Sequence, residues 1–183
     1  MSFWSKLFHK EEKKEVDPNY LELPYGKFLF DDEEELEIGY EADIDWYGNG
    51  SEPVSIFIEV DVPGSRDASL GVERFTRLYD DRKQVDYKVK LTAAEHYLGD
   101  DSSIVDDCGE TISKEEFLEG FTITAVYVYR SGKRVYSLEF PWVRDGMDHL
   151  CVIFDEDDKA IVLEDSEYYK EFKSLIYPDL ADE

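Results

Sequence analysis

The residues of this sequence that could do chemistry are mainly carboxylates, with 45 Asp and Glu against 20 Lys and Arg among 183 residues. Two carboxylates at a suitable separation can act as acid and base, as they do in glycoside hydrolysis. With this many acids, some pair reaches a suitable separation by chance, so the count alone indicates no catalytic pair. An enzyme whose site is built from dispersed carboxylates is one hypothesis to carry forward.

Acidic clusters also suggest calcium binding, which requires acids at fixed positions of a twelve-residue loop. A loop starting at Asp155 has Ser166 at position twelve, and one starting at Asp43 has Val54 there, where a glutamate is needed. The three histidines are scattered and form no zinc-binding spacing; they are His9, His96 and His149. We therefore predict no metal and no cofactor.

His149 is the histidine to follow, because a strand would place it on the same face as Cys151, two residues on. A thiol and an imidazole so placed could pair as thiolate and imidazolium. Cys151 lies within the apolar run Leu150 to Phe154, however, so we interpret it as a small buried hydrophobe. Trp142 is a large aromatic residue of the kind that anchors protein interfaces. We take Trp142 and His149 as candidates for binding a partner. No nucleophile elbow, phosphate-cradling loop or dinucleotide fingerprint occurs.

The clearest structural pattern lies between residues 35 and 46, where apolar and acidic residues alternate. Even positions carry Leu36, Ile38, Tyr40, Ala42, Ile44 and Trp46, and the acids at odd positions are Glu35, Glu37, Glu41, Asp43 and Asp45. A strand with this period has one apolar face and one acidic face. The acidic face is interpreted either as solvated sheet surface or as a ridge that binds a basic partner.

The formal net charge of -25 limits the classes of molecule that the protein can bind. Such a surface repels phosphate backbones and anionic headgroups, which argues against nucleic-acid binding. It attracts cationic surfaces and speeds their encounter, so the partner that the charge favours is a basic protein. The alternative is that the acidity only keeps the protein soluble.

Residues 1–18 are expected to form an amphipathic tail and linker, followed by a single acidic domain over residues 19–183. Phe3, Trp4, Leu7 and Phe8 recur at helical spacing before an almost wholly charged block. This segment could lie in a membrane interface with these four residues against lipid. The alternative is a tail that frays or docks on the domain, which is favoured because anionic membranes repel the acidic body.

Period-two patterns predict an antiparallel β meander at the start of the domain. Its strands are expected near Phe28 to Phe30, over Leu36 to Trp46, and over Val54 to Val62, with a turn at Gly48-Asn49-Gly50. A helical segment then runs from Arg66 to Leu98. It is either one helix or two broken near Asp80-Asp81, and a strand over Val85 to Leu91 is a further alternative.

A second meander follows a short helix whose start is indicated by a capping box, Ser113 with Glu116. Strands are expected over residues 121–129, 136–142, 150–154 and 160–163, and a closing helix over 168–176. The predicted fold class is therefore α+β, with two antiparallel β meanders, a helical segment between them and a C-terminal helix.

Cysteine usage and hydropathy indicate the compartment. Cys108 and Cys151 are the only cysteines, too few for a disulfide framework. No run reaches the roughly 20 apolar residues that span a bilayer, and the N-terminus lacks a signal-peptide pattern. We expect a cytoplasmic protein.

The segment from residue 112 to residue 154 carries a resemblance. Its capped helix Ile112 to Leu118, the β region from Phe121 and the stretch through Trp142 to His149 resemble a bacterial family of uncharacterised domains. In that family a β region ends near an aromatic-Gly-His element, of which only His149 is matched here, after Met147-Asp148. The first meander, with its acidic turns, is similar to predicted immunity proteins of polymorphic toxin systems. The resemblance implies a bacterial, cytoplasmic, non-catalytic protein.

These observations lead to three hypotheses for function. The first is a non-catalytic protein-interaction module, in its most specific form an immunity-type inhibitor whose acidic surface occupies a basic active site. The second is an enzyme with a dispersed carboxylate and His149 site. The third is a peripheral membrane adaptor that uses the N-terminal segment.

Overall fold

The structure, a computed structural model, describes residues 19–32, 37–99, 101, 103–105, 109, 111–139, 149–164 and 174–177. Several residues singled out above lie outside these ranges: Phe3, Trp4, Leu7, Phe8, Glu35 and Trp142. The hypotheses that concern them stay predictions. Within the described ranges, no helix is long and apolar enough to cross a membrane.

Strands and helices occur in the grouped order typical of the α+β class, and that class is confirmed. The elements are β1 (Tyr20–Leu23), β2 (Gly26–Asp31), β3 (Gly39–Ile44), β4 (Val54–Glu59), α1 (Ser69–Asp80), α2 (Arg82–Leu98), β5 (Ser103–Val105), β6 (Thr111–Ser113), α3 (Lys114–Gly120), β7 (Thr122–Val128), β8 (Arg134–Glu139), β9 (His149–Phe154) and β10 (Ala160–Glu164).

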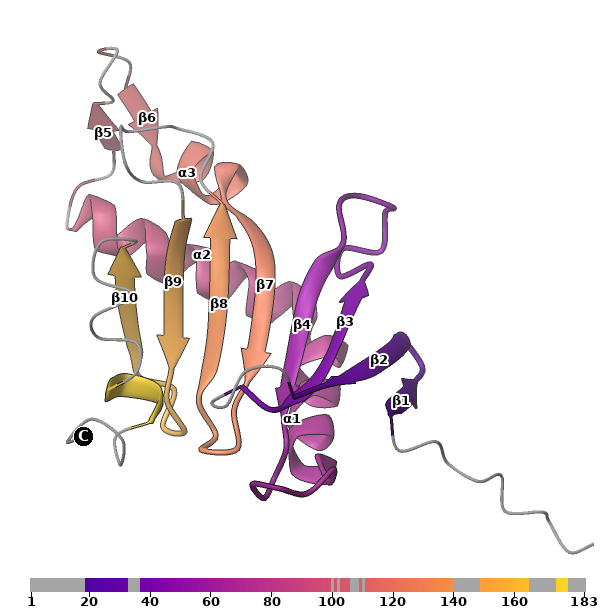
Figure 1. Ribbon diagram of the computed structural model, residues 1–183. Helices are drawn as coiled ribbons and strands as arrows, with labels where there is room; N and C mark the ends of the chain where they lie inside the picture. The colour runs from indigo at the N-terminus through magenta and orange to yellow at the C-terminus, as the bar shows by residue number, and fades with distance from the viewer. Residues whose placement is uncertain are drawn as a thin grey trace, which may run out of the picture.

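Eight of the strands form one sheet in the order β1-β2-β3-β4-β7-β8-β9-β10 (Figure 1). Both predicted meanders are part of it, and neighbours pair antiparallel except β4 and β7, which pair in parallel with Ser55 opposite Ala125. A parallel pair needs a crossover connection, and here the chain between the two strands contains α1, α2 and α3. The two meanders are thus halves of a single sheet.

The alternation predicted around β3 is confirmed for the residues of this strand that the structure describes. Tyr40, Ile44 and Trp46 are buried on the helix-covered face, whereas Glu41 and Asp43 are exposed on the other. Gly39, the odd position without a side chain, lies against the ring of Phe57 on β4. A Cβ atom at Gly39 would stand 2.7 Å from that ring and 2.4 Å from the Ile58 carbonyl oxygen, so only glycine fits.

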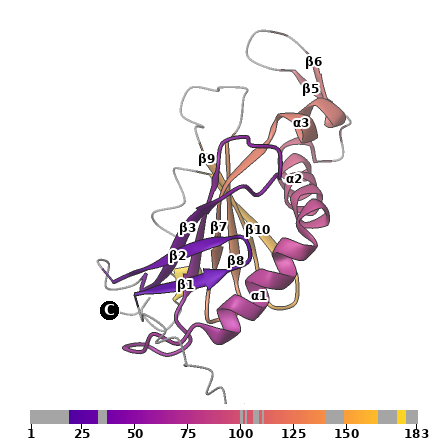
Figure 2. The ribbon, with the colours of Figure 1, turned by 90° about the vertical axis from the view of Figure 1, so that its right-hand side faces the viewer.

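Two helices, and not one, occupy the segment after the first meander. They break at Asp81, as the Asp80-Asp81 alternative predicted, and the strand alternative for Val85 to Leu91 is wrong because these residues belong to α2. Asp61 helps to start α1: its carboxylate accepts the amides of Leu70 and Gly71 at 2.9 and 3.3 Å. Figure 2 shows both helices on the same face of the sheet.

The main core fills the space between this helix layer and the sheet. At its centre, Trp46 and Phe75 approach with ring centroids 6.5 Å apart, and Tyr79 lies 6.0 Å from Trp46. The capped helix α3 packs beside α2 through Phe117 and Tyr97, 6.1 Å apart. Its predicted capping box is present, since Ser113 Oγ accepts the Glu116 amide and the Glu116 carboxylate accepts the Ser113 amide.

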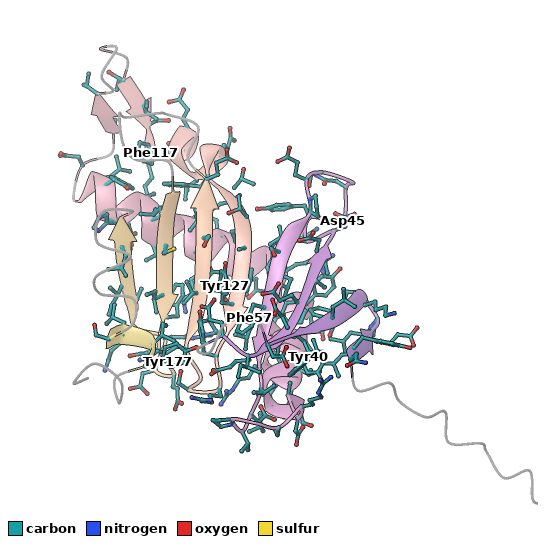
Figure 3. The ribbon with its side chains drawn as sticks, viewed as in Figure 1. Tyr40, Asp45, Phe57, Phe117, Tyr127 and Tyr177 are labelled. Atoms are coloured by element: carbon teal, nitrogen blue, oxygen red, sulfur yellow. The ribbon has the colours of Figure 1, made fainter. Side chains whose placement is uncertain are left out.

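The opposite face of the sheet is covered unevenly. Over β7 to β10, residues 174–177 pack on it, with Ile176 and Tyr177 buried against Tyr129, Val135 and Ile153. Residues 174–176 are helical, and the rest of the predicted closing helix lies outside the described residues. Figure 3 shows Phe57 and Tyr127 side by side on this face, above Tyr177. No described residue covers the same face over β2 and β3, where Leu29 is 59% exposed.

Candidate functional site

The face opposite the helices is built from one cross-strand row that spans all eight strands. Read through the sheet register, the row is Tyr20, Leu29, Glu41, Phe57, Tyr127, Val135, Ile153 and Ile161. Its first part is open, since Leu29 and Glu41 are exposed. Its central members Phe57, Val135 and Ile153 are buried, whereas Ile161 at the other edge of the sheet is 44% exposed. The change from open to covered surface falls between β3 and β4.

A groove of about 540 Å³ lies on the open part of this face. We call it the acidic groove; it is lined by Lys27, Leu29, Phe30, Asp31, Glu41, Ala42, Asp43 and Ser55. Its walls come from β2, β3 and β4, held side by side by the sheet hydrogen bonds. The lining is thus placed by backbone pairing, which makes the spacing between its charges rigid.

The charges of the acidic groove are three carboxylates against one ammonium group. Asp31, Glu41 and Asp43 supply the negative charge, and Lys27 lies at the β1 side with its Nζ 3.6 Å from the centre of the Tyr20 ring. The exposed side chain of Leu29 lies on the same lining, directly across the β2-β3 pair from Glu41. An apolar contact beside a carboxylate suits a Lys or Arg side chain, which has an apolar stem and a charged head.

The predicted acidic ridge is divided among three places. Glu41 and Asp43 lie together in the acidic groove. The Glu37 carboxylate instead accepts a hydrogen bond from the Tyr129 hydroxyl at 3.1 Å, nearer the middle of the sheet. The Asp45 carboxylate accepts the amides of Gly48 and Gly50 at 2.7 and 3.2 Å, which fixes the predicted turn.

His149 lies elsewhere in the sheet. It opens β9, with its backbone in register opposite Glu139, and β4, β7 and β8 separate that strand from β3. Cys151, two residues on, is buried with 6% exposure as predicted, and its Sγ is 3.6 Å from Ser137 Oγ. Position 149 is therefore not part of the acidic groove.

A buried carboxylate that the sequence did not reveal is present at the end of β4. Glu59 is 2% exposed, and its Oε2 accepts the Arg130 amide at 2.7 Å while Oε1 lies 3.4 Å from Arg130 Nη1. Burial raises the pKa of the Glu59 carboxyl, the two Arg130 contacts oppose that rise, and the Glu37 carboxylate adds to it. The Glu59 side chain ties Arg130, the second residue beyond β7, to the end of β4, and this structural role accounts for a carboxylate at this buried position.

Three tyrosine rings form a cluster on the same part of the sheet. The Tyr127 and Tyr129 rings stack with centroids 6.3 Å apart, and Tyr177 meets Tyr129 edge-on at 6.0 Å. Burial, together with the Glu59 and Glu37 carboxylates, raises the pKa of the Tyr177 hydroxyl. The Tyr129 hydroxyl of this cluster is the group that donates to the Glu37 carboxylate.

The stability contribution of Glu59 should depend on pH in a defined direction. Because its folded pKa lies above the ordinary value of 4.5, the folded state binds more protons than the unfolded state as pH rises through that value. The free energy of unfolding of the wild type, relative to the Glu59→Gln variant, should therefore fall as pH rises from about 4 until the folded carboxyl has ionised, by about 1.4 kcal/mol for each unit of pKa elevation. Urea unfolding of both proteins across this range measures it. A difference that is constant or rises with pH would contradict the assignment.

The carboxylate-enzyme hypothesis requires two or more buried acids in one pocket. Among the described residues, Glu59 is the one buried charged side chain, and both of its oxygens face Arg130. In the same ranges, no three His, Cys, Asp or Glu side chains gather closely enough to hold a metal ion.

Sequence reasoning missed Leu29, Asp31, Lys27 and Ser55 as members of the acidic groove. A signal for Leu29 was present, because Phe28 and Phe30 alternate inward and leave an apolar residue on the solvent side. Ser55 and Lys27 carry no such signal. No protein-family model, curated protein or solved structure matches this chain.

Proposed function

We propose that this protein is a non-catalytic interaction module that binds a basic protein segment through the acidic groove. In its most specific form it is an immunity-type inhibitor, whose carboxylates occupy the cationic active site of the protein that it blocks. The observation that carries the proposal is the combination of Asp31, Glu41 and Asp43 with the exposed Leu29 on an uncovered stretch of described sheet.

The distribution of charge along the chain supports this choice of surface. Residues 19–61, which contain β1 to β4, include 13 acidic residues and a single lysine, whereas residues 69–98, which form α1 and α2, include five acids and six bases. Residues 139–183 are also acidic, with 14 acids and four bases, so the contrast in charge is between β1 to β4 and the two helices α1 and α2. A cationic partner is steered toward acidic surface and away from such a helix layer, which raises its association rate with the sheet.

The groove also offers a source of affinity besides charge. Exposed ion pairs each contribute only about 0 to 1 kcal/mol, so three carboxylates alone make a weak site. Burial of the exposed part of Leu29 beneath an apolar or aliphatic partner group adds a desolvated contact at the centre, with charges around it. A lysine- or arginine-rich segment with interspersed apolar residues meets both requirements.

The proposal is tested by affinity capture from native cell extract at low and at high salt, with mass spectrometry of the retained proteins. We expect a basic protein that is retained at low salt and released at high salt, because raising the ionic strength from about 0.1 to 1 M shortens the screening length from about 10 to 3 Å. If nothing basic is retained, or if salt leaves its retention unchanged, the acidic groove is not the binding surface.

A further inference from the structure

A second hollow, lined by residues of α1 and of the β7-β8 and β9-β10 turns, has a net positive lining. These turns lie at the ends of the strands that point away from α3 (Figure 1). Its volume is about 370 Å³. We call it the arginine pocket, because Arg74, Arg77 and Arg134 line it together with Glu156 and Asp158. We propose that the arginine pocket binds a phosphate group.

The three guanidinium groups converge from two elements. Arg74 and Arg77 are three residues apart on α1, a spacing that places both side chains on one helix face, and Arg134 opens β8. Arg74 Nη1 donates to the carbonyls of Tyr129 and Arg130 at 3.2 and 3.0 Å, which positions the group without neutralising it. Planar guanidinium groups held in place are well matched to phosphate oxygens.

The carboxylates of the pocket do not cancel this charge. Asp158 is shared between two cations, at 2.6 Å from Arg134 and 3.1 Å from Lys88. Arg134 is held in place through its Nη2, which also donates to the Asp155 carbonyl at 2.8 Å. Arg77 is 76% exposed and forms an ion pair with Glu73 on its own helix. Exposed pairs of this kind contribute only about 0 to 1 kcal/mol, so a phosphate can compete for the Arg77 guanidinium.

Glu156 limits the affinity of the arginine pocket for an anion. Its side chain lies against Gly132, whose φ of 87° makes the tight turn of the β7-β8 hairpin, and a Cβ atom there would stand 2.5 Å from Glu156 Cγ. Glu156 lines the pocket without an ion pair to any described residue. Its charge opposes an anion, as does the overall negative charge of the protein.

Titration of isotope-labelled protein with inorganic phosphate, followed by amide chemical shifts at constant ionic strength, tests the proposal. We expect saturable shifts at Arg77, Leu78, Gly132 and Glu156, and none with sodium chloride. Methyl phosphate as a second probe identifies the source: tighter binding of the ester indicates a phosphorylated ligand, and tighter binding of inorganic phosphate indicates free phosphate.

Variants separate a site from general charge attraction. Arg77→Gln should weaken phosphate binding at least about fivefold, and Glu156→Gln should strengthen it by about threefold. Lys83→Gln is the control, because it removes the same charge from an exposed position on α2 outside the pocket. Equal losses for Arg77→Gln and Lys83→Gln, or unsaturable shifts in both the wild type and Glu156→Gln, would overturn the proposal. Because the acidic groove is intact in all four proteins, the outcome is independent of the proposed function.

Discussion

Neutralising two carboxylates of the acidic groove, with Glu41→Gln and Asp43→Asn combined, should weaken binding of the basic partner by about 5- to 30-fold. Both residues lie on the open face of β3, two positions apart, and line the same groove. Losing two exposed charges that a bound cation would contact costs about 1 to 2 kcal/mol, and each 1.4 kcal/mol is a tenfold change in Kd. Titration calorimetry or surface plasmon resonance with the captured partner gives the value.

The matched control is a double variant with the same chemical changes on another surface, Glu119→Gln with Asp157→Asn. Glu119 is exposed on α3, and Asp157 is exposed in the β9-β10 turn, where it makes only a surface ion pair with Lys159. We expect the control to alter Kd by less than about threefold, through the net charge alone. If the two double variants weaken binding equally, overall acidity and not the groove carries the interaction.

Trp46→Ala should lower the free energy of unfolding by about 3 to 5 kcal/mol, the range for removing a large aromatic side chain from a core. Trp46 is 1% exposed and joins the end of β3 to the helix layer through Phe75 and Tyr79. Its removal leaves a cavity between sheet and helix that neither element can close without moving. Chemical denaturation monitored by circular dichroism measures the loss.

Trp46→Phe distinguishes packing from hydrogen bonding at this position. The Trp46 Nε1 atom is buried and has no hydrogen-bond partner among the described residues, so phenylalanine gives up no bond and retains much of the ring volume. We expect it to cost about 1 kcal/mol, well under half of the alanine variant. A loss as large as that of Trp46→Ala would mean that the indole nitrogen has a partner that stabilises the fold.

The features that the sequence predicted well are those set by short-range physics. The two-residue period around Tyr40 and Ile44 places those side chains in the core because a strand alternates its faces. The Ser113 and Glu116 capping box and the break at Asp81 depend only on residues within one helical turn. In each case the chain pattern and the tertiary structure favour the same conformation.

What could not be predicted depends on contacts between distant segments. The parallel pairing of β4 with β7 brings Ser55 beside Ala125, seventy residues apart, and no local pattern marks that choice. The burial of Glu59 follows from the same pairing, because its partner is the Arg130 amide just beyond β7. From sequence alone, Glu59 resembles any outward-facing acid on an alternating strand.

The candidate site likewise contains residues that short-range patterns predicted and residues that they did not. Glu41 and Asp43 were identified from alternation and do lie together in the acidic groove. Asp45 belongs to the same alternating series, yet its carboxylate accepts the turn amides, because the strand ends at Ile44 and Gly48 brings the chain back. The sequence did not identify Leu29 and Asp31, because it is the pairing of β2 with β3 that brings them into the acidic groove.

The most direct test of the central claim is to titrate isotope-labelled protein with a lysine-rich peptide that carries interspersed leucines, and to map the amide chemical shifts at low salt. The account predicts saturable shifts confined to β2, β3 and the start of β4, centred on Leu29, Glu41 and Asp43, that disappear at high salt. Shifts spread over all acidic residues, or centred on the helix layer or on β9, would contradict the acidic groove as the binding surface.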